Sequence, residues 1–259
     1  MKKRIILAAL AVAMSAVTLF GCGKKDKNGD MIYAVEAGSA GEEAAKSNNF
    51  KVNSVSSQAD ALMEVSAGTS DAAVIDLLMA NAMVGEGTDY ADLKYTDKLT
   101  TEFYGVGCRK DSDLTDFINS VFAETYKDGT MMELAKKYKI DDTIVEQKDC
   151  TYTEKKDGDV AYIKNKGTLV VGITDFAPMD YKENGEWVGF DADMARIVAK
   201  KLGVEIKFIE INWDSKIMEL EGKTIDVAWN GMTLTDEVKS SLNCTNPYCN
   251  NAQVVVVKK

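Results

Sequence analysis

Short apolar runs alternate with amphipathic segments along most of the chain, and this alternation predicts an α/β fold. The run at residues 71–76 is apolar except at its ends, which indicates a buried strand that ends in Asp76. Ser39 and Glu42 have the spacing of a capping box, so a helix is expected to begin there. The first body is predicted to hold strands at residues 31–36, 51–55 and 71–76, with helices after Ser39 and near residues 57–66 and 77–84.

A second body repeats the alternation after residue 167. Four consecutive valines at residues 254–257 indicate a buried closing strand. Residues 141–165 are charged and poor in apolar periodicity, which predicts a linker between the bodies. A strand is expected to leave the first body at residues 100–108, followed by helices at 114–127 and 130–139; the second body should hold strands at 168–174, 204–211, 225–229 and 253–257 and helices at 191–202 and 214–220.

The N-terminus has the pattern of a secretion signal. Lys2, Lys3 and Arg4 precede an apolar run at residues 5–20, and Cys22 follows directly after Gly21. A cysteine at that position predicts lipidation, with residues 1–21 removed as a signal peptide and 22–30 forming a lipid-anchored linker. Phe20 is bulkier than the usual residue there, so an ordinary cleaved signal or an uncleaved anchor stays open. The protein is expected outside the cytoplasm, held at the cell membrane.

Composition narrows the function classes. The formal net charge of −10 argues against nucleic acid as a partner. Histidine is absent, which excludes histidine-dependent catalysis and removes the commonest zinc ligand. No metal site and no cofactor are expected. Four further cysteines could form disulfides in three connectivities, and the sequence does not choose among them: Cys108, Cys150, Cys244 and Cys249.

Several short motifs occur together in a recognisable order. They are Phe176-Ala177-Pro178-Met179, Gly189-Phe190-Asp191, Gly231-Met232-Thr233 and Asn246-Pro247-Tyr248 in the second body, and Gly38-Ser39, residues 71–76 and Lys127-Asp128-Gly129 in the first. With these motifs the chain resembles an extracellular solute-binding protein of the amino-acid-binding type, family 3, but its two halves stand in circularly permuted order. The resemblance implies a two-lobe periplasmic-binding-protein-like fold of type II.

The resemblance also assigns parts of the chain. Residues 31–103 would be the family's second lobe, 104–140 a hinge crossing with helices that pack on the first lobe, 141–165 a linker, and 166–259 the family's first lobe. Only the crossing near residues 103–108 is then expected to stay covalent, so a loose hinge is predicted. Such proteins bind a free amino acid or a related amine between their lobes and deliver it to an ABC importer.

Candidate ligand contacts follow from the same resemblance. Asp76 matches the acid that binds the ligand ammonium group, although a strand-end carboxylate that caps the next helix is the structural alternative. The backbone at Ser39, Ala40 and Gly41 and around Thr233 could hold a carboxylate. Phe176 and Trp213 stand where aromatic walls are expected, and Asn230, Gly231 and Met232 would add strand-end contacts.

One position departs from the family. Val238 stands where an arginine usually clamps the ligand carboxylate. Lys239 is a conceivable substitute, and Glu36 could face a cationic ligand group or simply be a surface acid. Beyond its signal the chain has two arginines, Arg109 and Arg196, and neither matches. The identity of the ligand therefore stays open.

An uptake receptor is the first interpretation, with an ABC permease as partner and a monomer expected. An orphan or sensory binding lipoprotein would use the same residues. A dehydratase-like enzyme on this scaffold would need an acid or base in the cleft, with Asp76, Glu36 and Asp175 as the candidates, and we expect no enzyme activity.

Overall fold

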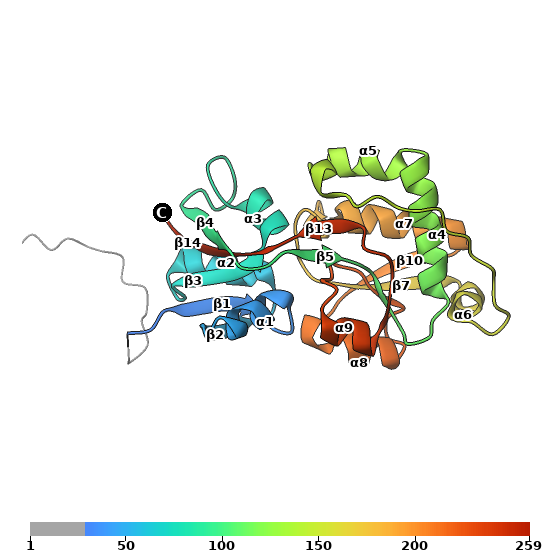
Figure 1. The fold of residues 1–259 in the computed structure, drawn as a ribbon, viewed down its shortest axis with the longest axis horizontal. Coiled ribbons are helices and arrows are strands. Elements are labelled where there is room, and N and C mark those ends of the chain that lie inside the picture. Colours follow the sequence, from blue (N-terminus) through green and yellow to red (C-terminus); the bar gives the residue numbers. More distant parts are fainter. Residues whose placement is uncertain (1–28) are drawn as a thin grey trace, which may run out of the picture.

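The computed structural model describes residues 29–259, which fold into two α/β lobes placed side by side (Figure 1). The lipidation and signal predictions for residues 1–21 and Cys22 lie outside the described residues. The "β1 lobe" is the sheet with strand order β2-β1-β3-β14-β4 and its helices; the "β7 lobe" is the sheet with order β10-β7-β11-β6-β12 and its helices. The prediction of a two-lobe α/β fold is confirmed.

The β1 lobe consists of β1 (Ile32–Glu36), α1 (Ala40–Ser47), β2 (Lys51–Val55), α2 (Gln58–Ala67), β3 (Ala72–Asp76), α3 (Leu77–Met83), β4 (Leu93–Lys98) and β14 (Gln253–Lys258). Strands β2, β1 and β3 run parallel, and β14 lies antiparallel between β3 and β4. Every residue of β3 is buried, as its apolar pattern predicts. Ser39 caps α1 by accepting a hydrogen bond from the Glu42 backbone N–H (3.1 Å), which confirms the predicted cap.

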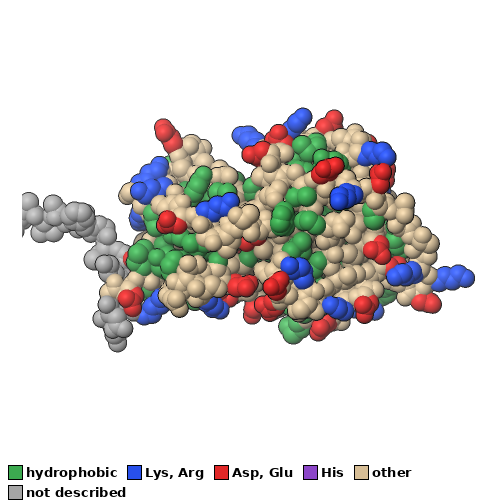
Figure 2. Space-filling model, in the orientation of Figure 1, with side chains coloured by type: hydrophobic (Ala, Val, Ile, Leu, Met, Phe, Trp, Pro, Cys, Tyr) green, Lys and Arg blue, Asp and Glu red, His purple; other side chains and the backbone are tan. Residues whose placement is uncertain are grey.

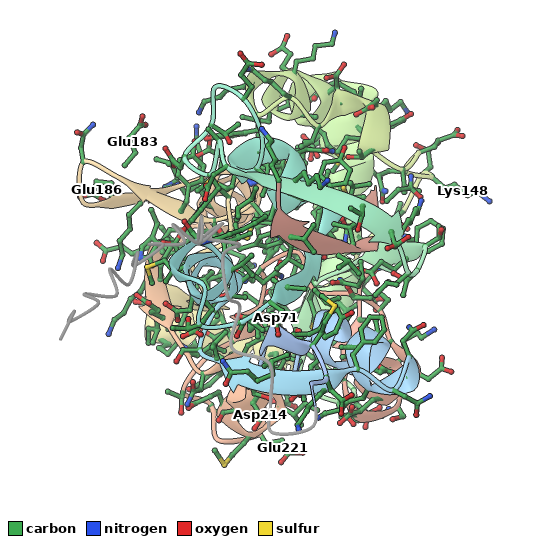
Figure 3. The ribbon with its side chains drawn as sticks, turned by 90° about the vertical axis from the view of Figure 1, so that its left-hand side faces the viewer. Asp71, Lys148, Glu183, Glu186, Asp214 and Glu221 are labelled. Carbon is green, nitrogen blue, oxygen red and sulfur yellow. The ribbon has the colours of Figure 1, made fainter. Side chains whose placement is uncertain are left out.

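The β7 lobe consists of β6 (Gly107–Cys108), α4 (Leu114–Lys127), α5 (Thr130–Lys137), η1 (Asp141–Thr143), α6 (Asp159–Lys166), β7 (Thr168–Ile173), β8 (Tyr181–Glu183), β9 (Glu186–Val188), α7 (Phe190–Leu202), β10 (Glu205–Glu210), η2 (Trp213–Ser215), α8 (Lys216–Glu221), β11 (Val227–Ala228), α9 (Asp236–Ser241) and β12 (Asn243–Cys244). Strands β10, β7 and β11 run parallel, and β6 lies antiparallel to β11. Glu183 and Glu186 project away from the body at the tip of the β8–β9 hairpin (Figure 3).

Two strands cross between the lobes: β5 (Glu102–Tyr104) and β13 (Cys249–Asn251), which pair antiparallel. After β5 the chain enters the β7 lobe as β6, and after β13 it returns to the β1 lobe as β14 (Figure 1). The prediction that only one crossing is covalent is therefore wrong, and with it the basis for a loose hinge. Each crossing delivers one antiparallel strand into the opposite sheet.

The prediction that residues 166–259 form one lobe is wrong at its C-terminal end, because residues 253–258 belong to the β1 lobe. The valines form a buried strand, as predicted, but β14 pairs with β3 and β4 of the β1 lobe. Val257 pairs with Ala72, which in turn pairs with Tyr33. The end of β14 and the start of β1 thus lie at the same edge of one sheet, with only β3 between the two strands.

Residues 141–165 are only partly the predicted linker, because their last residues begin helix α6. Val160 and Ile163 of α6 are fully buried against the β7 lobe. Arg109 binds Asp159 at the start of this helix (Nε–Oδ2 3.0 Å), and Lys166 at its end binds Asp226 (2.6 Å). Two apolar side chains and these ion pairs hold the segment in place.

Candidate interlobe binding site

The carboxyl ends of the central parallel strands meet where the lobes face each other. Strands β1 and β3 end in Glu36 and Asp76, and Thr174 follows β7 directly. Asn230 lies just beyond β11 and binds Thr174 twice: its Oδ1 accepts from the Thr174 backbone N–H (3.0 Å) and its Nδ2 donates to the Thr174 hydroxyl (2.7 Å). This is the edge at which open α/β sheets place ligands.

A cavity of about 340 Å³ opens on this seam, and we call it the interlobe cavity. Its β1-lobe wall is the start of α1, with Gly38, Ser39 and Ala40. Its β7-lobe wall contains Trp213, Lys216, Met232, Thr233 and Val238. The volume lies at the lower end of the usual range for small-molecule sites.

Half of the predicted ligand contacts line this cavity: Ser39, Ala40, Trp213, Met232 and Thr233. The residues that do not line it are Gly41, Asp76, Phe176, Asn230 and Gly231. Half of the candidate contacts therefore face one cavity between the lobes, and the structure places the other half outside its lining.

Asp76 is buried among side-chain donors. Its carboxylate accepts hydrogen bonds from Gln58, Tyr104, Asn251 and Gln253. Both of its oxygens are engaged, so in this structure Asp76 holds the crossing strands to the end of β3. Burial, reinforced by the nearby Glu102 carboxylate, raises the pKa of Asp76 well above its usual range.

Glu102 extends this network toward the cavity. Its Oε1 accepts hydrogen bonds from Asn251 Nδ2 (2.8 Å), Gln253 Nε2 (2.7 Å) and the Thr233 hydroxyl (2.9 Å). Thr233 is therefore positioned by a residue at the start of the β5 crossing. Sequence reasoning missed Glu102, because no local pattern shows that it meets Asp76.

Phe176, Gly231 and Tyr104 pack closely behind the cavity. The Phe176 and Tyr104 rings meet edge to face with centroids 6.2 Å apart. Gly231 has φ +56°, and an added Cβ would lie 2.3 Å from Phe176 Cε1. Asp191 Oδ2 accepts a hydrogen bond from the Gly231 backbone N–H (2.6 Å), so the turn is held from the start of α7. Phe176 and Gly231 support the seam rather than line the cavity.

Glu36 is buried and has a carboxylate oxygen, Oε1, without a hydrogen-bond partner among the described residues. Burial raises its pKa to about 7. The interpretation of Glu36 as a surface acid is therefore wrong. A buried acceptor that lacks a donor is unfavourable, and a polar or cationic group entering the seam would satisfy it.

The predicted cationic substitute for the missing arginine is not where it was expected. Lys239 is half exposed, pairs with Asp236 (3.2 Å), and does not line the interlobe cavity. Arg109 binds Asp159 and Asp226, and Arg196 binds Asp193. Val238 does line the cavity. The buried cation of this wall is Lys216, which sequence reasoning did not single out.

Other hollows follow the same seam. One groove lies between Met79 and Met83 of the β1 lobe and Tyr138 and Pro178 of the β7 lobe. The molecule is notched at the upper edge between the lobes in Figure 2, which also shows acidic and basic side chains interspersed over this face.

None of the described residues forms a cluster that could hold a metal ion, and all four described cysteines are free. No helix in the described part of the chain is long and apolar enough to cross a membrane.

Comparison with known proteins supports the family resemblance over one segment of the chain. The profile of the bacterial extracellular solute-binding proteins, family 3, matches residues 169–259. The resemblance is therefore confirmed for this segment. The match runs from β7 through the β13 crossing to the end of β14, so it includes the strand that this segment contributes to the β1 lobe.

The names of similar proteins describe them as amino-acid-binding proteins. The arginine-binding extracellular protein ArtP of Bacillus subtilis is 36% identical over 95 residues, which is 36% of this chain and 37% of ArtP. The L-cystine-binding protein TcyJ of Escherichia coli is 34% identical over 99 residues, 38% of this chain and 37% of TcyJ. The alignment spans little more than a third of either relative's length.

Solved structures give a similar partial overlap. The arginine-bound form of domain 1 from TmArgBP is 38% identical, with a TM-score of 0.33, and covers 38% of this chain and 85% of that domain.

Proposed function

We propose that this protein is an extracytoplasmic solute-binding lipoprotein that captures an amino acid or a related small amine between its lobes. The observation that carries the proposal is the interlobe cavity, where Ser39 and Ala40 of one lobe face Trp213 and Thr233 of the other. The names of the relatives that match residues 169–259 support an amino acid as the ligand. Binding by two lobes requires that each contributes a wall, as these residues do.

The proposed site has three parts. The start of α1 offers backbone N–H groups, and α1 also carries the favourable end of a helix dipole for an anion. Trp213 and Met232 offer apolar surface to a side chain. Glu36 and Asp76 supply buried carboxylates at the strand ends, and the proposed role of Asp76 toward an ammonium group requires that it release one of its present donors.

The remaining parts of the proposal concern the setting of the protein. Lipidation at Cys22 would hold the lobes near the membrane through residues 22–30, and an ABC permease would receive the ligand. We propose binding without catalysis, in a monomer. We also propose that the order of the halves is circularly exchanged relative to the relatives, which is supported by the nearness of the end of β14 to the start of β1.

A thermal-shift screen tests the binding function. Purified protein is melted with L-arginine, L-cystine or L-histidine and with the other standard amino acids. A ligand at a hundredfold excess over its dissociation constant should stabilise the fold by about 2.7 kcal/mol. A concentration-dependent rise in melting temperature with at least one amino acid or amine is expected. A cooperative melt that no compound shifts would contradict the proposal.

A further inference from the structure

Lys216 is a buried cation on the wall of the interlobe cavity. It is the first residue of α8 and is only 6% exposed. Its Nζ atom donates to the Gly38 carbonyl oxygen across the seam (2.9 Å) and to the Trp213 carbonyl oxygen (3.2 Å). It also lies 5.2 Å from the centroid of the Trp213 ring. Among residues 29–259, no carboxylate forms an ion pair with it.

This arrangement leaves the ammonium group incompletely satisfied. An ammonium has three N–H donors, and the described partners take two of them. Burying a charge without a counterion is costly unless the charge is neutralised by a partner. Burial accordingly lowers the pKa of Lys216, although the negative charges of Glu237, Glu36 and Asp214 act to raise it. An anionic group that enters the cavity would supply the missing partner.

The opposite wall of the cavity is suited to the same anion. Ser39 caps α1, and Ala40 begins the helix, where backbone N–H groups have no acceptor within the helix. Glu42, Glu43 and Lys46 also line this wall. Glu42 is already engaged, since its Oε2 accepts from the Gly38 N–H (3.0 Å) and its Oε1 pairs with Lys46 (3.0 Å). On the wall of Lys216, Asp214 and Glu237 line the cavity without forming an ion pair with it, and Val238 adds no charge.

We infer that Lys216 is the residue that recognises the carboxylate of the ligand in the interlobe cavity. This inference rests on the proposed function and deepens it, because it names the side chain that binds the carboxylate end of the ligand. Lys216 would bind the carboxylate from the β7 lobe while the start of α1 binds it from the β1 lobe. The ligand class is accordingly a small molecule with a free carboxylate, and an amine without one should bind poorly.

The test compares matched ligands on matched variants by calorimetric titration. The probes are L-arginine and L-histidine, their carboxamides, the decarboxylated amines agmatine and histamine, and succinate. The variants are Lys216→Met, Lys216→Arg, and Lys239→Met as a control on an exposed lysine outside the cavity. Melting each variant without ligand shows that it folds, and Lys216→Arg keeps a cation at the site if Lys216→Met does not fold.

We expect a carboxylate ligand to bind the unmodified protein and Lys239→Met equally, and to lose about 10- to 100-fold in affinity in Lys216→Met. Lys216→Arg should keep most of the affinity. The carboxamide should bind the unmodified protein weakly and lose nothing more in Lys216→Met.

Three other results would overturn the inference. Equal binding of a carboxylate ligand to Lys216→Met would do so while leaving the proposed function intact. Binding of the amines alone would also overturn it, and the protein would then be an amine receptor. If no probe binds and no amino acid of the thermal-shift screen shifts the melt, the proposed function fails together with the inference.

Discussion

The Lys216 ammonium and the Gly38 carbonyl oxygen lie 2.9 Å apart across the seam between the two lobes. The two lobes also meet tightly beside this bond, since an added Cβ on Gly38 would lie 2.5 Å from Asp214 Cα. Asp214 is labelled in Figure 3, near the strands of the β1 lobe. The closed arrangement therefore requires a glycine at residue 38.

Gly38→Ala should hold the lobes apart. Gly38 has φ +69° and Gly68, the cap of α2, has φ +76°, so alanine at either residue should cost about 1 kcal/mol of backbone strain. Only at Gly38 does the new methyl group meet the other lobe, since Gly68 has just Lys258 Nζ nearby at 3.7 Å. Small-angle X-ray scattering should show a larger radius of gyration for Gly38→Ala than for Gly68→Ala. Equal radii would show that the closed seam tolerates the methyl group.

Glu36 should make stability depend on pH. Burial raises its pKa from 4.5 to about 7, so the folded state favours the protonated acid. Its contribution is fully present below pH 4.5 and is lost as the pH rises through 7. Glu36→Gln should remove this loss, worth about 3 kcal/mol at pH 8.

Urea unfolding at pH 5 and pH 8 measures this effect. The unmodified protein should lose more stability between the two values than Glu36→Gln does. Glu183→Gln, at the exposed tip of the β8–β9 hairpin, is the control and should behave like the unmodified protein. The same pH dependence in Glu36→Gln as in the unmodified protein would show that Glu36 is hydrated in solution.

Asp76→Asn should destabilise the protein without any ligand. The carboxylate accepts from Gln58, Tyr104, Asn251 and Gln253, and an amide offers only one accepting oxygen. Leaving buried donors unsatisfied should cost about 2 kcal/mol in urea unfolding. Asp97→Asn, on the exposed face of β4, should cost nothing measurable. A neutral effect of Asp76→Asn would mean that its donors find water instead.

The two crossings should exchange their amide hydrogens at similar rates. Phe103 of β5 pairs with Asn250 of β13, and each of these strands lies between two strands of the main sheets along the chain. Hydrogen exchange measured by mass spectrometry should therefore show comparable protection for residues 102–104 and 249–251. Rapid exchange confined to one crossing would restore the prediction of a loose hinge.

Local pattern was sufficient for much of the fold. The apolar run before Asp76 predicts the buried strand β3, and the Ser39–Glu42 spacing predicts the cap of α1. Helix α6 was missed because only Val160 and Ile163 face the core, and its ends are held by ion pairs with residues distant in the sequence.

The partners of a strand and the neighbours of a side chain are not local properties. The valines predict that β14 is buried but not that it joins the β1 lobe, because either sheet would bury them. Likewise, the sequence singles out Val238 as a departure, whereas the burial of Lys216 beside the start of α1 depends on how the lobes close.

Calorimetric titration of the Trp213→Ala variant tests the interlobe site most directly. Trp213 lines the interlobe cavity, whereas Trp187 lies on the β8–β9 hairpin and serves as the control. We predict saturable binding of at least one amino acid or amine by the unmodified protein and by Trp187→Ala, with affinity at least about tenfold weaker in Trp213→Ala. No saturable binding to the unmodified protein, or undiminished binding to Trp213→Ala, would contradict a ligand site between the lobes.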